Sequence, residues 1–69
     1  MNKEIVLKNN LKEARQQKKL SQEELASIVG TTRQTIIAIE KGQFNPSTKL
    51  SLLISLAVDK SVEEIFYLE

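Results

Sequence analysis

A chain of 69 residues forms a single domain, and a domain of this size buries only about 60% of the surface that its unfolded chain exposes. It contains no cysteine and no histidine, which excludes a disulfide framework and a thiolate metal site. Its apolar runs are much shorter than the roughly 20 residues of a membrane span, and residues 1–10 lack the apolar core of a signal peptide. We therefore expect a cytoplasmic domain of marginal stability, in contact with no membrane, that gains from sharing its core with a second copy.

The net charge of +1 hides an uneven distribution along the chain. Residues 1–49 carry nine Lys or Arg and five Glu, a balance of +4, whereas residues 50–69 carry one Lys and four acidic residues, a balance of −3. Because phosphate repels the acidic end, a nucleic acid is expected to meet the earlier part of the chain. Random scatter of charge in a short chain is the alternative interpretation.

The first helix is predicted from Leu11 to about Lys18, because Asn9 and Asn10 can cap its start. Leu11 and Ala14 recur at the spacing of an inward face. Mostly outward positions are expected for the cationic residues, which are Lys12, Arg15, Lys18 and Lys19.

The second helix is predicted to begin at Gln22 and to span about eight residues. Ser21 and Glu24 form a capping box, in which each side chain binds the backbone N–H of the other residue. Gly30 ends the helix, because the left-handed conformation that commonly follows a helix costs a glycine least. The inward stripe is predicted to be Leu25, Ile28 and Val29.

The third helix is predicted from Arg33 to about Lys41, with Thr32 as its cap and Gly42 closing its end. Only the two threonines before Arg33 separate it from the second helix, so the turn between the two helices is tight. Its inward positions are Ile36 and Ile39.

The fourth helix is predicted from Thr48 to about Val58, after a loop over Gln43–Pro46 and a cap at Ser47. Its apolar residues recur at the spacing of one buried face, and two further leucines widen that face. The face comprises Leu50, Leu53, Ile54 and Ala57, widened by Leu52 and Leu56. A second capping box, Ser61 to Glu64, opens a last short helix through Ile65 and Phe66.

The two ends of the chain allow two interpretations. Ile5 and Leu7 alternate with polar neighbours, and so do Phe66 and Leu68, which suits a small two-stranded ribbon that joins the termini. A frayed N-terminus, together with a last helix that simply ends, is the alternative.

The second and third helices meet the requirements of a helix-turn-helix. Ala26 allows the two helices to approach closely, Gly30 permits the turn, and the inward isoleucines hold the third helix so that its outer face stays free. The segment from Leu20 to Gly42, LSQEELASIVGTTRQTIIAIEKG, resembles the helix-turn-helix of the phage repressor and Cro-like family of regulators, also called the XRE family. The resemblance continues through Asn45-Pro46-Ser47 and covers about residues 10–66.

This resemblance implies an all-α, five-helix lambda-repressor-like domain over residues 1–69, with the helix-turn-helix at 21–41. The short C-terminal end resembles that of the small stand-alone, homodimeric members of the family. Two positions depart from the family pattern. Thr31 stands in the turn where the family commonly has an apolar residue, which is expected to loosen the packing of the two helices, and Ile37 stands where small polar residues are common.

In this family the second helix of the motif enters the major groove with its N-terminal end toward the base edges. The resemblance therefore implies base contacts from Thr32, Arg33 and Gln34, with the arginine suited to guanine, the glutamine to adenine and the threonine methyl to a thymine methyl. Solvated residues at a helix start, or a bridge from Gln34 to Gln22, are the alternatives. Ile37 and Ala38 follow one turn later, although Ile37 is alternatively buried in part against the first helix or the loop.

Phosphate contacts are implied by the same resemblance. Gln22 stands at the start of the second helix, where free backbone N–H groups and the helix dipole favour an anion. Further phosphate candidates are Lys41, Asn45, Thr48 and Lys49, although solvation alone explains any one lysine equally well. Arg15 and Glu40 match family positions that form an internal ion pair, with two independent surface charges as the alternative.

The expected function is that of a sequence-specific transcriptional regulator, a repressor that binds a palindromic operator as a homodimer with half-sites ~34 Å apart. Its partners are then double-stranded DNA and a second copy, which meets segments 1–8 and 62–69. The late apolar residues exceed what a small core can hide and are the dimer-surface candidates: Val58, Val62, Ile65, Phe66, Tyr67 and Leu68.

An antitoxin, or another protein-binding module with accessory DNA binding, is the alternative function. An enzyme is not expected, because the chain has no His or Cys, no glycine-rich phosphate loop and no metal-ligand cluster. For the same reason we expect no cofactor, no metal and no small-molecule ligand.

Overall fold

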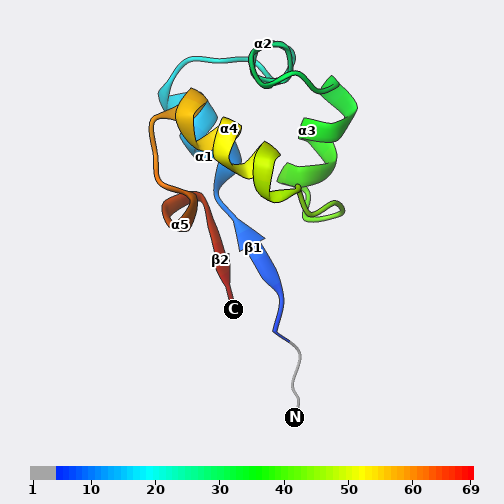
Figure 1. Cartoon of the computed structure of the whole chain (residues 1–69), viewed down its shortest axis with the longest axis vertical. Helices are drawn as coiled ribbons and strands as arrows, with labels where there is room; N and C mark the ends of the chain where they lie inside the picture. The colour runs from blue at the N-terminus through cyan, green and yellow to red at the C-terminus, as the bar shows by residue number, and fades with distance from the viewer. Residues whose placement is uncertain (1–4) are drawn as a thin grey trace.

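Five helices and one two-stranded sheet make up residues 5–69, the part of the chain that the computed structural model describes (Figure 1). The elements are β1 (Leu7–Asn9), α1 (Leu11–Gln17), α2 (Gln22–Val29), α3 (Arg33–Glu40), α4 (Thr48–Val58), α5 (Val62–Ile65) and β2 (Phe66–Leu68). The predicted five-helix fold is therefore confirmed. Residues 1–4 of the predicted dimerisation segment 1–8 lie outside the described residues.

Short polar side chains start four of the five helices. Ser21, Thr32, Ser47 and Ser61 each accept a hydrogen bond from the backbone N–H three residues later, and both predicted capping boxes are complete. At the start of α1, one of the two predicted asparagines supplies the side-chain bond. Asn10 occupies the cap position without a side-chain bond, and the Asn9 Oδ1 atom instead accepts from the Leu11 N–H over 3.1 Å.

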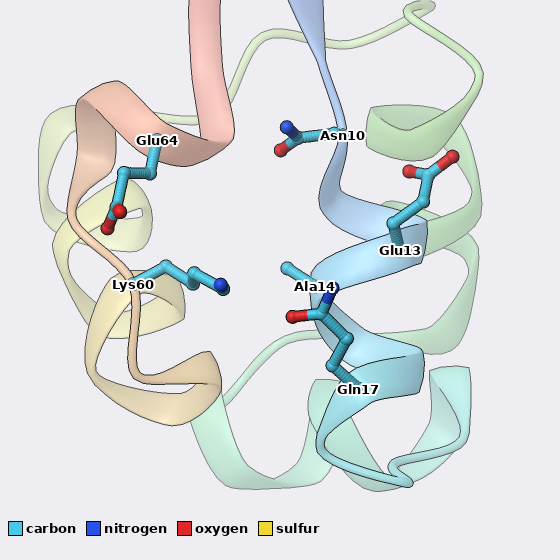
Figure 2. A pocket seen from close by; sticks show the side chains of 6 residues that line it. All are labelled: Asn10, Glu13, Ala14, Gln17, Lys60 and Glu64. Atoms are coloured by element: carbon cyan, nitrogen blue, oxygen red, sulfur yellow. The ribbon is translucent and has the colours of Figure 1, made fainter.

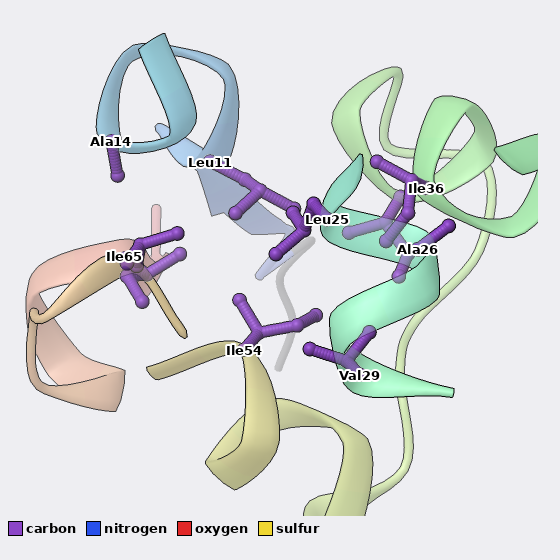
Figure 3. Close-up of a cluster of buried hydrophobic side chains, with 10 residues drawn as sticks. Leu11, Ala14, Leu25, Ala26, Val29, Ile36, Ile54 and Ile65 are labelled. Atoms are coloured by element: carbon purple, nitrogen blue, oxygen red, sulfur yellow. The ribbon is translucent and has the colours of Figure 1, made fainter. Parts of the chain in front are cut away.

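The core is a single cluster to which all five helices contribute. Figure 3 shows its side chains converging from all five helices, with Ile36 as the labelled member from α3. Its members are Leu11, Ala14, Leu25, Ala26, Val29, Ile36, Ile39, Ile54, Val58 and Ile65. With so few buried side chains, every large one carries a substantial share of the stability.

Four predicted orientations are wrong. Ile28 is 59% exposed, and Leu52 and Leu56 are 54% and 79% exposed, although all three were expected on buried faces. Successive residues of a helix are rotated by about 100° about its axis. Ile28 therefore points about 100° away from the buried Val29, and Leu52 and Leu56 point to the side opposite Ile54. Arg15 shows the opposite error, because it was expected outward and is buried.

The termini form the ribbon. β1 and β2 pair in antiparallel register, with Leu7 opposite Leu68 and Asn9 opposite Phe66. Two backbone hydrogen bonds of 2.9 Å between Val6 and Glu69 extend the pairing beyond the strands. The ribbon is tied to the helices by the Asn9 Nδ2 atom, which donates to the Ile39 carbonyl over 2.9 Å. Within the described residues, no helix is both long enough and apolar enough to cross a membrane.

Candidate nucleic-acid interface

The packing of α2 on α3 leaves one face of α3 free. Gly30 ends α2 with a φ of +78°, and the Thr31 N–H then donates to the Ala26 carbonyl over 2.9 Å, which turns the chain sharply into α3. Ala26 lies buried in the same cluster as Ile36 and Ile39 of α3. Because these residues fix the inner face of α3, its outer face is presented as a rigid surface.

The residues predicted to contact bases lie exposed at the start of α3. The Thr32 hydroxyl accepts from the Thr35 N–H over 3.2 Å and shares a hydrogen bond of 3.0 Å with the Thr35 hydroxyl. The cap thus occupies the Thr32 hydroxyl and leaves its methyl group for other contacts. Among the described residues, the side chains of Arg33 and Gln34 have no hydrogen-bond or ion-pair partner, so their donors are free for base edges.

Ile37 and Ala38, one turn further along α3, are both half-buried. They keep part of their surface beside Arg33 and Gln34, so the second turn of α3 adds apolar surface to the polar first turn. The half-buried state of Ile37 agrees with the alternative in which it packs in part against the domain.

A buried ion pair anchors the C-terminal end of α3 to α1. The Arg15 Nε atom lies 2.7 Å from Glu40 Oε2, and the two side chains are only 9% and 6% exposed. The Arg15 Nη2 atom donates to Glu40 Oε1 over 3.3 Å, and Nη1 donates to the Leu20 carbonyl over 2.9 Å. The predicted ion pair is thus present, and it explains why Arg15 is buried.

The same carboxylate holds Gln22, the candidate for a phosphate contact at the start of α2. The Gln22 Nε2 atom donates to Glu40 Oε1 over 3.1 Å, a contact that was not predicted from the sequence. It replaces the alternative bridge between Gln22 and Gln34. A glutamine amide has two N–H donors, so one remains for a phosphate while Glu40 fixes the orientation of the amide.

The remaining phosphate candidates lie at both ends of α3. Lys41 follows the last turn of α3, while Thr48 and Lys49 begin α4. The start of α4 lies beside the helix-turn-helix, because residues of both segments line the same cleft. These residues are Val29, Gly30, Thr31, Ser47, Lys49, Leu50 and Leu53. These three candidates and Asn45 are exposed, and the residue in the turn that departs from the family pattern, Thr31, lines the cleft.

Comparison with known proteins identifies this arrangement. A helix-turn-helix family model, HTH_3, matches residues 11–65, from the start of α1 to the end of α5. The chain belongs to the Cro/C1-type (XRE) helix-turn-helix family. It is therefore a DNA-binding transcriptional regulator of the helix-turn-helix type.

Curated relatives of this XRE regulator carry the same description. It is 48% identical over 63 residues to YgzD of Bacillus subtilis, an uncharacterized HTH-type transcriptional regulator, covering 91% of this chain and 96% of the relative. The same identity and coverage hold for an uncharacterized HTH-type transcriptional regulator of Methanocaldococcus jannaschii. Among solved structures, the restriction-modification controller protein C.AhdI of Aeromonas hydrophila matches with a TM-score of 0.73, 39% identity and 78% coverage of both chains.

The late apolar residues of the regulator divide into buried and accessible ones. Val58 and Ile65 are 1% and 0% exposed, so they belong to the core of one copy and have no surface to offer a second. Their inclusion among the dimer-surface candidates is wrong. Val62 and Phe66 are half-buried, and Tyr67 and Leu68 are exposed on the ribbon.

A polar pocket lies on another part of the XRE domain, between α1 and the segment around α5 (Figure 2). It is lined by Asn10, Glu13, Ala14, Gln17, Lys60 and Glu64, none of which is a predicted DNA contact. The backbone N–H of Ser61 lowers the pKa of the Glu64 carboxyl, helped by the Ser61 hydroxyl and by the charge of Lys60. The Ser61–Glu64 pair is the second capping box, so this pKa shift reports helix capping.

Proposed function

We propose that the regulator is a repressor that binds a palindromic operator as a homodimer, with the α3 helix of each copy in the major groove. The observation that carries the proposal is the contrast between the two faces of α3. Its inner face is fixed by Ile36, Ile39 and the ion-paired Glu40, whereas on its outer face the donors of Arg33 and Gln34 are engaged by no residue in positions 5–69. A rigid helix with free donors at its start suits direct base readout.

The energetics favour two copies over one. Each bidentate pair of a side chain with a base edge discriminates by about 1–3 kcal/mol, and α3 offers two such side chains. Specific DNA binding commonly exceeds non-specific binding by about 4–10 kcal/mol, of which the roughly 2–6 kcal/mol from one copy of α3 covers only the lower part. Two copies related by a two-fold axis double the readout and require a palindromic site with half-sites ~34 Å apart.

A repressor of this kind acts in the cytoplasm by occluding a promoter, and it needs no enzymatic activity. The description of C.AhdI as a controller protein supports a regulatory role for a chain with this fold. An in vitro transcription assay tests the proposal, with a DNA site that the chain binds placed across a promoter. Transcript should fall as protein is added and should stay constant with Arg33→Ala. A rise in transcript would instead indicate an activator.

Selection of bound sequences from a random DNA pool tests the base readout. The wild-type chain should enrich a palindrome, and Arg33→Ala and Gln34→Ala should each relax the preference at one position in each half-site. Arg33→Lys is the matched control for charge, because lysine keeps the cation but lacks the bidentate fork. It should retain phosphate attraction and lose the same base preference as Arg33→Ala.

Two results would overturn this assignment. An enriched motif that is identical in all three variants would show that other residues read the bases. No enriched motif for the wild-type chain would favour the alternative of an antitoxin or other protein-binding module.

A further inference from the structure

The outer face of α4 carries an apolar pair that no described element covers. Leu52 and Leu56 stand one helical turn apart and are 54% and 79% exposed, so together they leave uncovered more than one whole leucine. No charged residue occurs from position 50 to position 58. Figure 1 shows α4 lying in front of α1, and its main neighbours in the fold are α2 and α5. A single exposed leucine is ordinary, but an uncharged stripe along one helix face is typical of an interface.

We propose that a second copy of this chain covers the outer face of α4, with Leu52 and Leu56 of each copy in contact across the two-fold axis. The proposal rests on the proposed function, because it names the surface through which the homodimer forms. It replaces the terminal surface expected from sequence. Of that surface, Val58 and Ile65 are buried within one copy, and Tyr67 and Leu68 lie on a ribbon that projects from the helices (Figure 1).

The direction of α4 argues for a second copy as the occupant. Ser47 and Lys49, at the start of α4, line a cleft with Gly30 and Thr31 of the turn that leads into α3. The start of α4 therefore lies at the same end of the domain as the predicted base contacts. A two-fold axis running along α4 keeps both helix starts, and both copies of α3, at that end, as a palindromic operator requires.

The distance between the two copies of α3 supports the same arrangement. Within one copy α3 packs chiefly on α2, and α4 packs on the same α2. Packed helices lie about 8–10 Å apart. A partner seated on α4 separates the two α3 helices by about three to five such spacings, roughly 25–50 Å, a range that contains the ~34 Å between half-sites.

Sedimentation equilibrium of the full chain tests the proposal. Leu52→Gln and Leu56→Gln replace apolar surface by a polar side chain of similar length with good helix propensity. Each should raise the dimer dissociation constant by about tenfold or more, with the larger effect at the more exposed Leu56. The matched control is Leu68→Gln on the ribbon, 69% exposed, which should leave the dissociation constant within about twofold.

DNA binding supplies a second readout that a misfolded variant would not reproduce. Leu56→Gln should bind an isolated half-site with the affinity of the wild-type chain, and it should lose the cooperative gain on the full palindrome. Circular dichroism should show unchanged helix content, because the substituted side chain is mostly exposed.

The outcomes separate this inference from the proposed function. If Leu68→Gln weakens the dimer and the α4 variants do not, the inference is overturned and the homodimer stands on the ribbon instead. If the wild-type chain is monomeric and binds palindromes without cooperativity, the homodimer of the proposed function is itself overturned. If both α4 variants weaken the dimer and the control does not, the inference is supported.

Discussion

The two contacts proposed for this protein, α3 with DNA and α4 with a second copy, use opposite kinds of surface on two helices of the same fold. α3 and α4 each bury one face in the common core, through Ile36 and Ile39 in α3 and Ile54 and Val58 in α4. Their free faces differ in chemistry. The free face of α3 begins with the polar residues Thr32, Arg33 and Gln34, whereas that of α4 carries two exposed leucines.

The difference matters because the two faces gain free energy in different ways. Polar donors gain little from burial against hydrocarbon and gain specificity from base edges and phosphates. Exposed leucines gain from removal of water and supply no base discrimination comparable with that of a bidentate donor. In the proposed dimer, the same helical scaffold therefore separates DNA readout from assembly. Breaking the anchor of each helix tests whether the two faces are independent.

The largest effect is expected from the anchor of α3. Glu40→Ala leaves the buried Arg15 guanidinium without its partner and should lower the free energy of unfolding by about 3–5 kcal/mol. That is a large part of the roughly 3–10 kcal/mol expected for 69 residues. Urea denaturation measures the loss. Lys18→Ala is the control, because it breaks an exposed pair with Asp59 at 3.7 Å and should cost less than about 1 kcal/mol. Equal losses in the two variants would contradict the structural role of Glu40.

The second prediction compares the two faces of α4 with one type of substitution. Ile54→Ala removes a fully buried side chain and should cost about 2–5 kcal/mol. Leu56→Ala, only two residues away, should leave the unfolding of a single copy nearly unchanged, within about 0.5 kcal/mol. Chemical denaturation at protein concentrations below the dimer dissociation constant measures both. A large loss for Leu56→Ala under these dilute conditions would show that its face is buried within one copy.

Local features of the fold could be predicted from sequence because their causes lie within a few residues. The caps at Ser21, Thr32, Ser47 and Ser61 were predicted correctly, since each depends on a hydroxyl and a backbone N–H three residues later. The ribbon could only be offered as one of two alternatives. Its pairing joins residues about sixty positions apart and depends on how the helices bring the two ends together.

Orientation was harder to predict wherever apolar residues surround a helix. α4 has apolar residues on most sides, so hydrophobicity alone does not say which side the neighbouring helices cover, and Leu52 and Leu56 were placed on the wrong side. The bond from Gln22 to Glu40 spans 18 residues and has no local signal. The residues predicted to contact DNA rest on the family resemblance, and their roles remain predictions.

The third prediction concerns the boundary between the two faces, at the start of α4. Lys49 is exposed there and is predicted to contact a phosphate. Lys49→Ala should weaken binding to all DNA sequences alike and reduce the slope of log K against log salt by about 1 per bound copy, because one fewer counterion is released at each half-site. Fluorescence anisotropy over a salt series measures the slope. Lys8→Ala on the ribbon removes the same charge elsewhere and should leave the slope unchanged. A changed base preference in Lys49→Ala would place this residue among the readers of sequence.

The smallest effect is expected at α5, away from both free faces. Hydrogen bonds from Ser61 lower the pKa of Glu64 below its ordinary value of 4.5 in the folded chain. The folded state therefore binds this proton less readily than the unfolded state does, so the carboxylate adds stability above pH 4.5 and the gain is lost as the pH falls through the lowered pKa. Glu64→Gln should be slightly less stable than the wild-type chain near neutral pH, and the difference should vanish once the pH lies below the lowered pKa of Glu64. Thermal unfolding over this pH range measures it. Since Glu64 belongs to neither free face, half-site affinity and the dimer dissociation constant should both stay at their wild-type values near neutral pH, and a change in either would mean that α5 couples the two faces.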